Sequence, residues 1–179
     1  GTGQMYITGP DVIKSATGEE ISHDELGGAL AHSTKSGVAH FAIDGEERCL
    51  NEVRRLLSFL PQNNGDDPPN QATTDQANRV DMDLRGLVPD DPNVPYNMKQ
   101  VIARIVDLGD FLEIHETYAQ NIIVGLARMD GRVVGVVAQQ PSYLAGVIDT
   151  EASVKADPVW VSGLASRISA MISLTSCTH

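Results

Sequence analysis

Two apolar runs joined by Asp130-Gly131 constrain the fold of this chain more than any other feature. Residues 121–129 and 132–139 are rich in Val and Ile, and Asp-Gly between two such runs is a strong short-range signal for a β-hairpin. Both arms are too apolar for a hairpin with one face in water. We therefore expect them to lie in a sheet covered on both faces, which favours a mixed α/β fold.

Helix and strand signals surround this hairpin. Residues 46–60 place apolar side chains at intervals of three and four, which predicts an amphipathic helix that ends at Pro61. Ser22 followed by Glu25 forms a capping box and predicts a helix containing Gly27-Gly28. Further short helices are expected at residues 11–16 and 98–106, and short strands at residues 5–8, 37–43 and 111–114.

Residues 62–78 differ from the rest of the chain in composition. They contain Asn63-Asn64-Gly65, Pro68-Pro69 and several aspartates, but no aliphatic residue larger than Ala. Such a stretch cannot bury a core. The sequence therefore predicts a linker between two units of mixed helices and strands.

The overall charge and the cysteines exclude some classes of partner. The 179 residues include 13 basic and 24 acidic ones, a formal net charge of -11, so nucleic acid and anionic membranes would be repelled. The sequence has neither an uncharged run long enough to span a membrane nor a signal-peptide pattern at its start. Cys49 and Cys177 lack metal or redox spacing, which suits a reducing, cytoplasmic location.

Motifs for self-contained chemistry are missing from the sequence. It has no phosphate-binding loop, no nucleophile elbow and no His pair at helical ligand spacing. His32 and His40 stand across an expected helix-to-strand break, which favours two structural histidines over a shared metal. Lys99 follows Met98 at the start of a helix rather than lying between two methionines in a hairpin. This context argues against a biotin-acceptor lysine.

Gly27 and Gly28 are unusual inside a predicted helix, where each costs about 1 kcal/mol relative to Ala. Something needs close approach to the backbone there. From the residues alone, tight packing against a neighbouring element is favoured over a bound substrate that passes the backbone.

A long series of segments follows the order found in one known family. In the first part they are residues 5–15, 17–20, 25–29, 36–40 and 57–64, together with His32; in the second part they are residues 96–98, 111–114, 121–125, 127–132 and 140–149. This series resembles the carboxyltransferase (beta) subunit of biotin-dependent acyl-CoA carboxylases, of the propionyl-CoA carboxylase and transcarboxylase type. The similarity runs from about residue 4 to residue 156 without a large gap.

The resemblance implies an α/β fold of the crotonase-like (ClpP/crotonase) superfamily, with the end of one crotonase-like domain followed by the start of a second. Residues 1–61 would be the C-terminal part of the first domain, 62–78 the linker, and 79–156 the first part of the second domain. Residues 157–179 depart from the family pattern and are expected to be a divergent tail.

The implied activity is transfer of a carboxyl group from carboxybiotin to an acyl-CoA, with propionyl-CoA or acetyl-CoA as the acceptor. Biotin would be carried on a partner, namely a biotin carboxylase or biotin carrier subunit, and further carboxyltransferase subunits would form a homo-oligomer. Alternatives are a methylmalonyl-CoA transcarboxylase or decarboxylase subunit, a plain crotonase-like hydratase or isomerase, and a non-catalytic fragment. The order of two units with a linker argues against a single hydratase domain.

The resemblance also suggests where ligands would lie. Thr8, Gly9, Pro10, Asp11, Gly27 and Gly28 are candidates near the acyl-CoA, and Gln140, Ala145 and Gly146 are candidates on the biotin side. The family's glycine-rich oxyanion loops are expected outside these 179 residues. We therefore assign no catalytic residue and no metal ligand. We expect this chain alone to be inactive. We also expect it to expose apolar surface at Ile7, Val38, Val124 and Val136.

Overall fold

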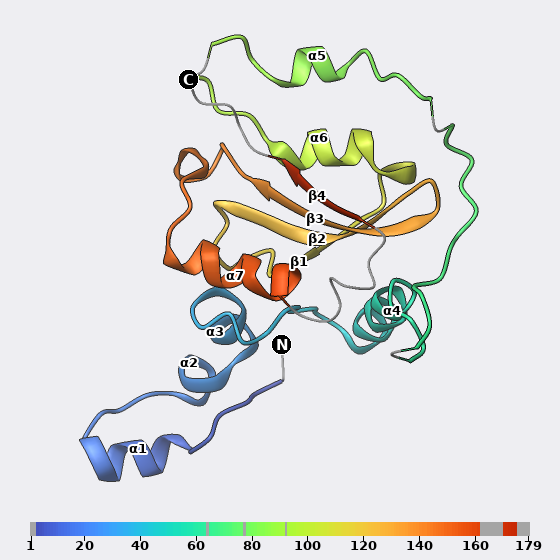
Figure 1. The fold of residues 1–179 in the computed structure, drawn as a ribbon. Helices are drawn as coiled ribbons and strands as arrows, with labels where there is room; N and C mark the ends of the chain where they lie inside the picture. Colours follow the sequence, from blue (N-terminus) through green and yellow to red (C-terminus); the bar gives the residue numbers. More distant parts are fainter. Residues whose placement is uncertain (1–2, 64, 77, 92, 162–169, 175–179) are drawn as a thin grey trace.

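The structure, a computed structural model, has three layers, with a four-stranded sheet between helices (Figure 1). It describes residues 3–63, 65–76, 78–91, 93–161 and 170–174. The strands are β1 (Phe111–Ile114), β2 (Ile122–Met129), β3 (Arg132–Gln139) and β4 (Ala170–Leu174). The helices are α1 (Pro10–Thr17), α2 (His23–Gly27), α3 (Ala29–Thr34), α4 (Glu46–Leu57), α5 (Leu84–Leu87), α6 (Met98–Ile105) and α7 (Thr150–Val161), with short 3-10 turns η1 (Asp107–Gly109) and η2 (Leu144–Gly146).

The predicted hairpin forms the centre of the sheet. β2 and β3 pair antiparallel, with Met129 opposite Arg132, and the order in the sheet is β1-β2-β3-β4. β1 pairs antiparallel with β2, whereas β4 runs parallel to β3. Asp130 (φ 52°) and Gly131 (φ 74°) both have left-handed backbone, as the tight hairpin turn requires.

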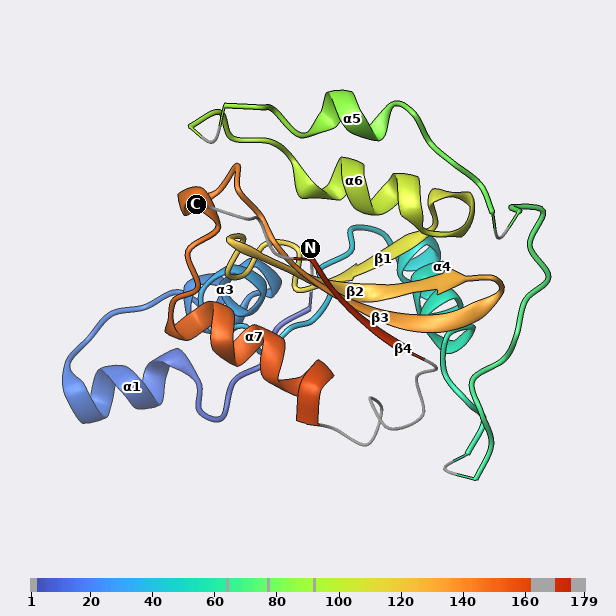
Figure 2. The ribbon, with the colours of Figure 1, turned by 45° about the horizontal axis from the view of Figure 1, so that its top comes forward.

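Helices cover both faces of the hairpin, as predicted. On one face, β2 and β3 pack against α6, whose Ile102 is buried. On the other face they pack against α7, whose Ala152 is buried. Figure 2 shows α6 and α7 on opposite sides of the sheet. Because successive side chains enter two different apolar layers, both arms read as continuous apolar runs rather than as alternating patterns.

Helix α4 and the residues after it attach the first part of the chain to the sheet. Phe59 is 1% exposed and packs on Leu112 and Leu126. The guanidinium carbon of Arg128, on β2, lies 4.0 Å from the centre of the Phe59 ring. Residues before and after the predicted linker therefore contribute to one apolar cluster, while the division of the chain into two domains stays a prediction.

Two predicted strands do not form. Residues 5–8 contain no strand, and the neighbouring Gln4 makes only an isolated bridge with Gly28. Residues 37–43 also contain no strand and contact the end of β1 through a hydrogen bond from His115 N to His40 O. An apolar, extended segment becomes a strand only where a neighbour offers it a ladder of backbone groups, and the local pattern cannot supply that neighbour.

The predicted helix around Gly27-Gly28 is interrupted. The backbone of Gly28 is extended (φ -68°, ψ 157°), so α2 ends before it and α3 begins after it. The capping box at the start of α2 is confirmed. Ser22 Oγ accepts a hydrogen bond from Glu25 N at 3.2 Å, while Glu25 Oε2 accepts one from Ser22 N at 3.1 Å.

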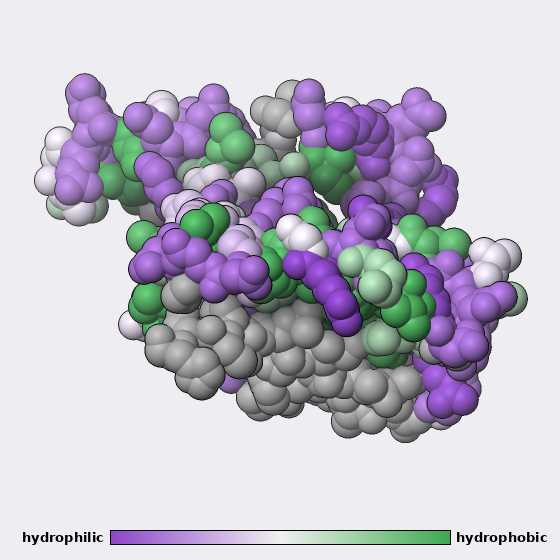
Figure 3. All heavy atoms as spheres, turned by 90° about the horizontal axis from the view of Figure 1, so that it is seen from above, coloured by the Kyte–Doolittle hydropathy of each residue, from purple (hydrophilic) through white to green (hydrophobic). Residues whose placement is uncertain are grey.

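The exposure of apolar residues differs between the two parts of the chain. Ile7 is 108% exposed and Val38 is 51% exposed, as expected. The same expectation was wrong for Val124 and Val136, each 1% exposed, because the helical layers cover both faces of the hairpin. On the face seen from above, apolar residues occur as separate areas among hydrophilic ones (Figure 3).

Residues after Asp157 fall partly inside the described structure. α7 continues to Val161, and β4 adds a parallel strand beside β3.

Cys177 lies outside the described residues, and Cys49 is a free, exposed cysteine. Among the described residues, no helix has the length and apolar character needed to cross a membrane.

Candidate functional site

The four candidates Thr8, Gly9, Pro10 and Asp11 form the start of α1. Gly9 is the residue before the helix and Pro10 is its first residue, a position where the missing N–H of proline is not needed. Thr8 and Asp11 are exposed, and α1 lies away from the sheet (Figure 1). None of these four residues lines the groove between α4 and β1 described below.

Gly27 and Gly28 are buried and lie against the segment that precedes Thr8. Met5 N donates to Gly27 O at 2.8 Å. A Cβ atom at Gly27 would lie 2.6 Å from Met5 O, and one at Gly28 would lie 2.5 Å from Asp24 O. Close backbone packing therefore leaves no room for a side chain at either position. At Gly27 the neighbour is the segment before Thr8, which agrees with the interpretation favoured from the sequence, whereas at Gly28 it is Asp24 of α2 itself. No hydrogen bond among the described residues joins them to residues 8–11.

The biotin-side candidates Gln140, Ala145 and Gly146 lie together in the loop that follows β3. Gln140 is 6% exposed, and its side chain is fully engaged with the start of α6. Its Oε1 accepts from Met98 N at 2.9 Å, and its Nε2 donates to Asn97 Oδ1 at 2.8 Å. Gln140 therefore holds the base of the loop to α6 and offers no free polar atom to a ligand.

Ala145 and Gly146 belong to a left-handed turn at the tip of this loop. Leu144 (φ 47°), Ala145 (φ 52°) and Gly146 (φ 70°) follow one another with positive φ. Gly146 N donates to Tyr143 O and Val147 N donates to Leu144 O, but the amides of Leu144 and Ala145 donate to no other described residue. Two adjacent backbone N–H groups without an acceptor among the described residues are suited to bind a carbonyl-type oxygen.

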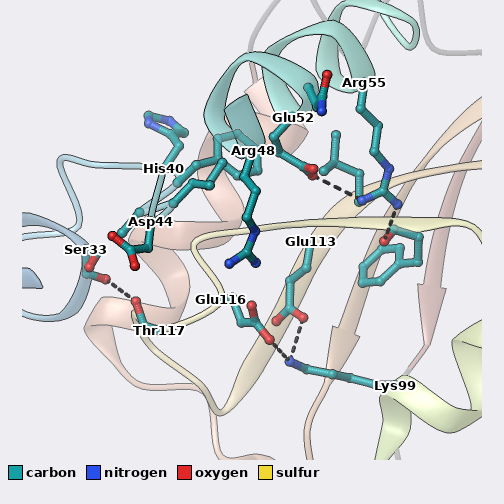
Figure 4. Close-up of a pocket in the computed structure, with 16 residues that line it drawn as sticks. Ser33, His40, Asp44, Arg48, Glu52, Arg55, Lys99, Glu113, Glu116 and Thr117 are labelled. Atoms are coloured by element: carbon teal, nitrogen blue, oxygen red, sulfur yellow. Dashed lines mark hydrogen bonds and ion pairs between the residues drawn. The ribbon is translucent and has the colours of Figure 1, made fainter. Parts of the chain in front are cut away.

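A groove of about 760 Å³ lies between α4, residues 40–44 and the strand β1 (Figure 4). Lys99 Nζ lies 2.6 Å from Glu113 Oε2 and 3.2 Å from Glu116 Oε1. Burial raises the pKa of Glu113, and the ammonium of Lys99 opposes that rise. Figure 4 shows Arg48 pointing from α4 into the groove on the side of these two glutamates.

None of the residues predicted from the sequence lines this groove. Its charged groups come from three segments that are far apart along the chain. Arg48 and Arg55 lie seven residues apart on one face of α4, and this spacing alone does not show what the face contacts. Arg55 Nη2 donates to Asp110 Oδ1 at 2.5 Å. Apart from Arg48, the cations here are paired with carboxylates, so the groove acts chiefly as a junction between α4 and β1.

Two buried basic residues lie beside the groove. Burial, together with the nearby His40 and Lys155, lowers the pKa of His115 to about 4. Burial also lowers the pKa of Lys155 to about 8, which leaves its ammonium charged at neutral pH. Lys155 Nζ donates to Tyr118 O at 2.8 Å, Ile122 O at 2.7 Å and Ala119 O at 3.3 Å. These contacts tie α7 to the start of β2.

In the part of the chain that the structure describes, no group of three or more His, Cys, Asp or Glu side chains is placed to hold a metal ion. His32 is engaged in local contacts. Its Nε2 donates to Met5 O at 2.5 Å and its Nδ1 lies 2.9 Å from Ser36 Oγ.

Comparison with known proteins gives one consistent result. The carboxyl transferase domain family matches residues 1–160. A propionyl-CoA carboxylase carboxyltransferase subunit of Haloferax mediterranei is 52% identical over 154 residues, which are 86% of this chain and 30% of that protein. A methylmalonyl-CoA decarboxylase subunit alpha of Veillonella parvula is also 52% identical over 154 residues, with the same coverage of 86% and 30%.

Solved structures agree with the sequence comparison. The transcarboxylase 12S structure with hydrolysed methylmalonyl-coenzyme A bound superimposes with a TM-score of 0.90 and 39% identity, and covers 98% of this chain and 35% of that one. A single-chain, multi-domain long-chain acyl-CoA carboxylase shares the fold. It superimposes with a TM-score of 0.75 at 23% identity, over 97% of this chain and 16% of that one. The chain spans about a third of the length of the relatives that it matches at high identity.

Proposed function

The chain belongs to the carboxyl transferase domain family, and from that membership we propose that the whole protein transfers a carboxyl group from carboxybiotin to an acyl-CoA. The observation that carries this proposal is the match of residues 1–160 to the family, together with the shared backbone of transcarboxylase 12S over 98% of the chain. The proposed acceptor is propionyl-CoA or acetyl-CoA, because the similar proteins include carboxyltransferase subunits named for these acyl groups.

The proposal includes the organisation expected from the sequence. Residues 1–61 would end one crotonase-like domain and residues 79–156 would begin the second, with residues 62–78 between them. Biotin would arrive on a carrier domain of a partner and supply the carboxyl group. Several copies of the subunit would assemble, which is supported by the hexamer assembly named for transcarboxylase 12S.

The described residues would bind and orient rather than perform the proton transfer. The turn at Leu144–Gly146 would present the amides of Leu144 and Ala145 to the ureido oxygen of biotin. Gln140 would hold the base of that loop on α6 through Met98 N. Gly27 and Gly28 would allow the backbone near residues 4–6 to pack closely, which places the Thr8–Asp11 segment relative to α2 and α3.

A decarboxylase or transcarboxylase is the second candidate. The methylmalonyl-CoA decarboxylase of Veillonella parvula is as similar to this chain as the propionyl-CoA carboxylase subunit, at 52% identity over 154 residues. Because the two relatives are equally identical to this chain, an activity measurement has to separate the two candidates.

The test uses the complete subunit with its biotin-carrying partner. ATP-dependent fixation of bicarbonate is measured with propionyl-CoA, acetyl-CoA and methylcrotonyl-CoA, and release of CO₂ from methylmalonyl-CoA is measured without ATP. We expect fixation to be fastest with propionyl-CoA or acetyl-CoA. Fixation fastest with methylcrotonyl-CoA would overturn the acceptor, and release of CO₂ without any ATP-dependent fixation would support the decarboxylase. A folded complex without either reaction would overturn the proposed function.

A further inference from the structure

The loop between β3 and α7 holds a backbone conformation that its own side chains do not stabilise. Leu144, Ala145 and Gly146 all have positive φ, which only glycine adopts without cost. Leu144 is 64% exposed and Ala145 is also exposed, so burial of these side chains does not fix the turn. Backbone hydrogen bonds from Gly146 N to Tyr143 O and from Val147 N to Leu144 O close the turn, so its position relative to the sheet depends on what holds the two ends of the loop.

Asn121, the residue before β2, contacts this base at both ends. Its side chain is buried, with 1% of the residue exposed, and its Nδ2 donates to Val147 O at 2.6 Å. Its backbone carbonyl accepts a hydrogen bond from Gln140 N at 2.9 Å. One residue thus ties the entry of the loop and its exit to the same point of the sheet.

The same side chain also reaches the beginning of α7. Asp149 Oδ1 accepts a hydrogen bond from Ala152 N at 2.8 Å and so caps that helix. Hydrogen bonds from Ala152 N and from the side chain of Asn121 lower the pKa of Asp149. A short side chain with a two-hydrogen donor can serve both Val147 O and Asp149, which a hydroxyl or a carboxylate cannot do.

We propose that Asn121 is a positioning residue, which holds the left-handed turn at Leu144–Gly146 so that the amides of Leu144 and Ala145 face the biotin-side ligand. The inference rests on the proposed function for the identity of that ligand, but not for the conformation of the loop. Asn121 itself does not touch the ligand and acts through Val147 and Gln140.

The test compares three substitutions in the complete subunit. Asn121→Asp keeps the shape but replaces the amide donor with a carboxylate, and Asn121→Ser shortens the side chain and is the milder change. Val137→Ala is the matched control. Val137 is buried in the same apolar cluster as Ile122, the residue after Asn121, and pairs with Val124 inside the sheet. Amide hydrogen exchange of Gly146 and Val147, whose N–H groups donate within the turn, reports the loop. Decarboxylation of methylmalonyl-CoA with free biotin separates the KM values of the two substrates.

For Asn121→Asp we expect exchange at Gly146 and Val147 to become at least tenfold faster and the KM for biotin to rise at least tenfold, with the KM for methylmalonyl-CoA within twofold of the parent. Asn121→Ser should show the same pattern to a smaller degree. Val137→Ala should lower the melting temperature without either change.

Equal loop exchange in the parent and in both Asn121 variants would overturn the inference. So would a rise of both KM values together, because a structural defect would not select the biotin side. If the parent subunit itself transfers no carboxyl group, the proposed function fails, and hydrogen exchange alone then decides whether Asn121 holds the loop. If Asn121→Asp does not fold, Asn121→Ser decides by the same two measurements.

Discussion

The imidazole rings of His40 and His115 are stacked, with their centroids 4.2 Å apart and an angle of 28° between their planes. His115 is 7% exposed, and its Nε2 has no hydrogen-bond partner among the described residues. His115 N also donates to His40 O at 3.0 Å. This pair joins residues 37–43 to the end of β1 without any strand pairing, and it buries the imidazole of His115.

We expect His115 to make the fold less stable as the pH falls from 7 to 5. Its pKa is about 4 in the folded state and 6.5 in the unfolded chain, so in this window the unfolded chain binds the proton and the folded one does not. The stabilisation by neutral His115 is complete above pH 6.5 and is lost toward pH 4, which amounts to about 2 kcal/mol between pH 7 and pH 5.

His115→Asn is the matched control for this prediction, because Asn tolerates the left-handed backbone of this position (φ 57°) and does not titrate. Urea unfolding at pH 5, 6, 7 and 8 gives the free energy of unfolding for both proteins. The parent should lose about 2 kcal/mol more than the variant on acidification. Parallel pH profiles would show that His115 is not held neutral.

Replacing Lys155 by Met should destabilise the protein by about 2 kcal/mol. The substitution keeps the apolar stem but removes the donor shared by Tyr118 O and Ile122 O, whose acceptors are then left in a buried site. Val154→Ala, at an exposed position on the same helix, should change the free energy of unfolding by less than about 0.5 kcal/mol. Equal effects of the two substitutions in urea unfolding would contradict this prediction.

Arg128→Met should cost more stability than the same change at Arg132. Arg128 lies over the Phe59 ring and donates from Nη2 to Ser58 O at 2.7 Å, whereas Arg132 is exposed at the start of β3. Loss of the cation–π contact and of the partly buried hydrogen bond should lower the free energy of unfolding by about 2 kcal/mol. Thermal unfolding of both variants checks the order, and a larger effect at Arg132 would refute it.

Gly28→Val should destabilise the protein by about 3 kcal/mol or more through overpacking. The backbone angles of Gly28 suit any residue, so the cost is steric and comes from the approach of Asp24 O. Gly86→Ala is the control, because a Cβ there meets nothing within 4 Å. We expect a clear fall in melting temperature for Gly28→Val and none for Gly86→Ala. An unchanged melting temperature for Gly28→Val would remove the steric explanation.

The candidate site shows where prediction from the sequence stopped. The resemblance pointed to Gln140, Ala145 and Gly146, and these residues do share one loop. It did not point to Asn121, because its role arises from hydrogen bonds to residues about 20 and 26 positions away. The groove residues Arg48 and Glu113 were also missed, since nothing in either local segment indicates that α4 lies beside β1.

The sequence by itself determined the elements whose stability is local or whose pattern is unambiguous. The Asp130-Gly131 turn, the capping box of Ser22 and Glu25, and the amphipathic α4 depend on residues within a few positions of each other. Tertiary structure alone decided that residues 37–43 form no strand, that the helix breaks at Gly28, and that Asn121 holds the loop at Leu144–Gly146. Each of these outcomes depends on which backbone groups of distant segments come within hydrogen-bond or van der Waals distance, and a local pattern carries no information about that approach.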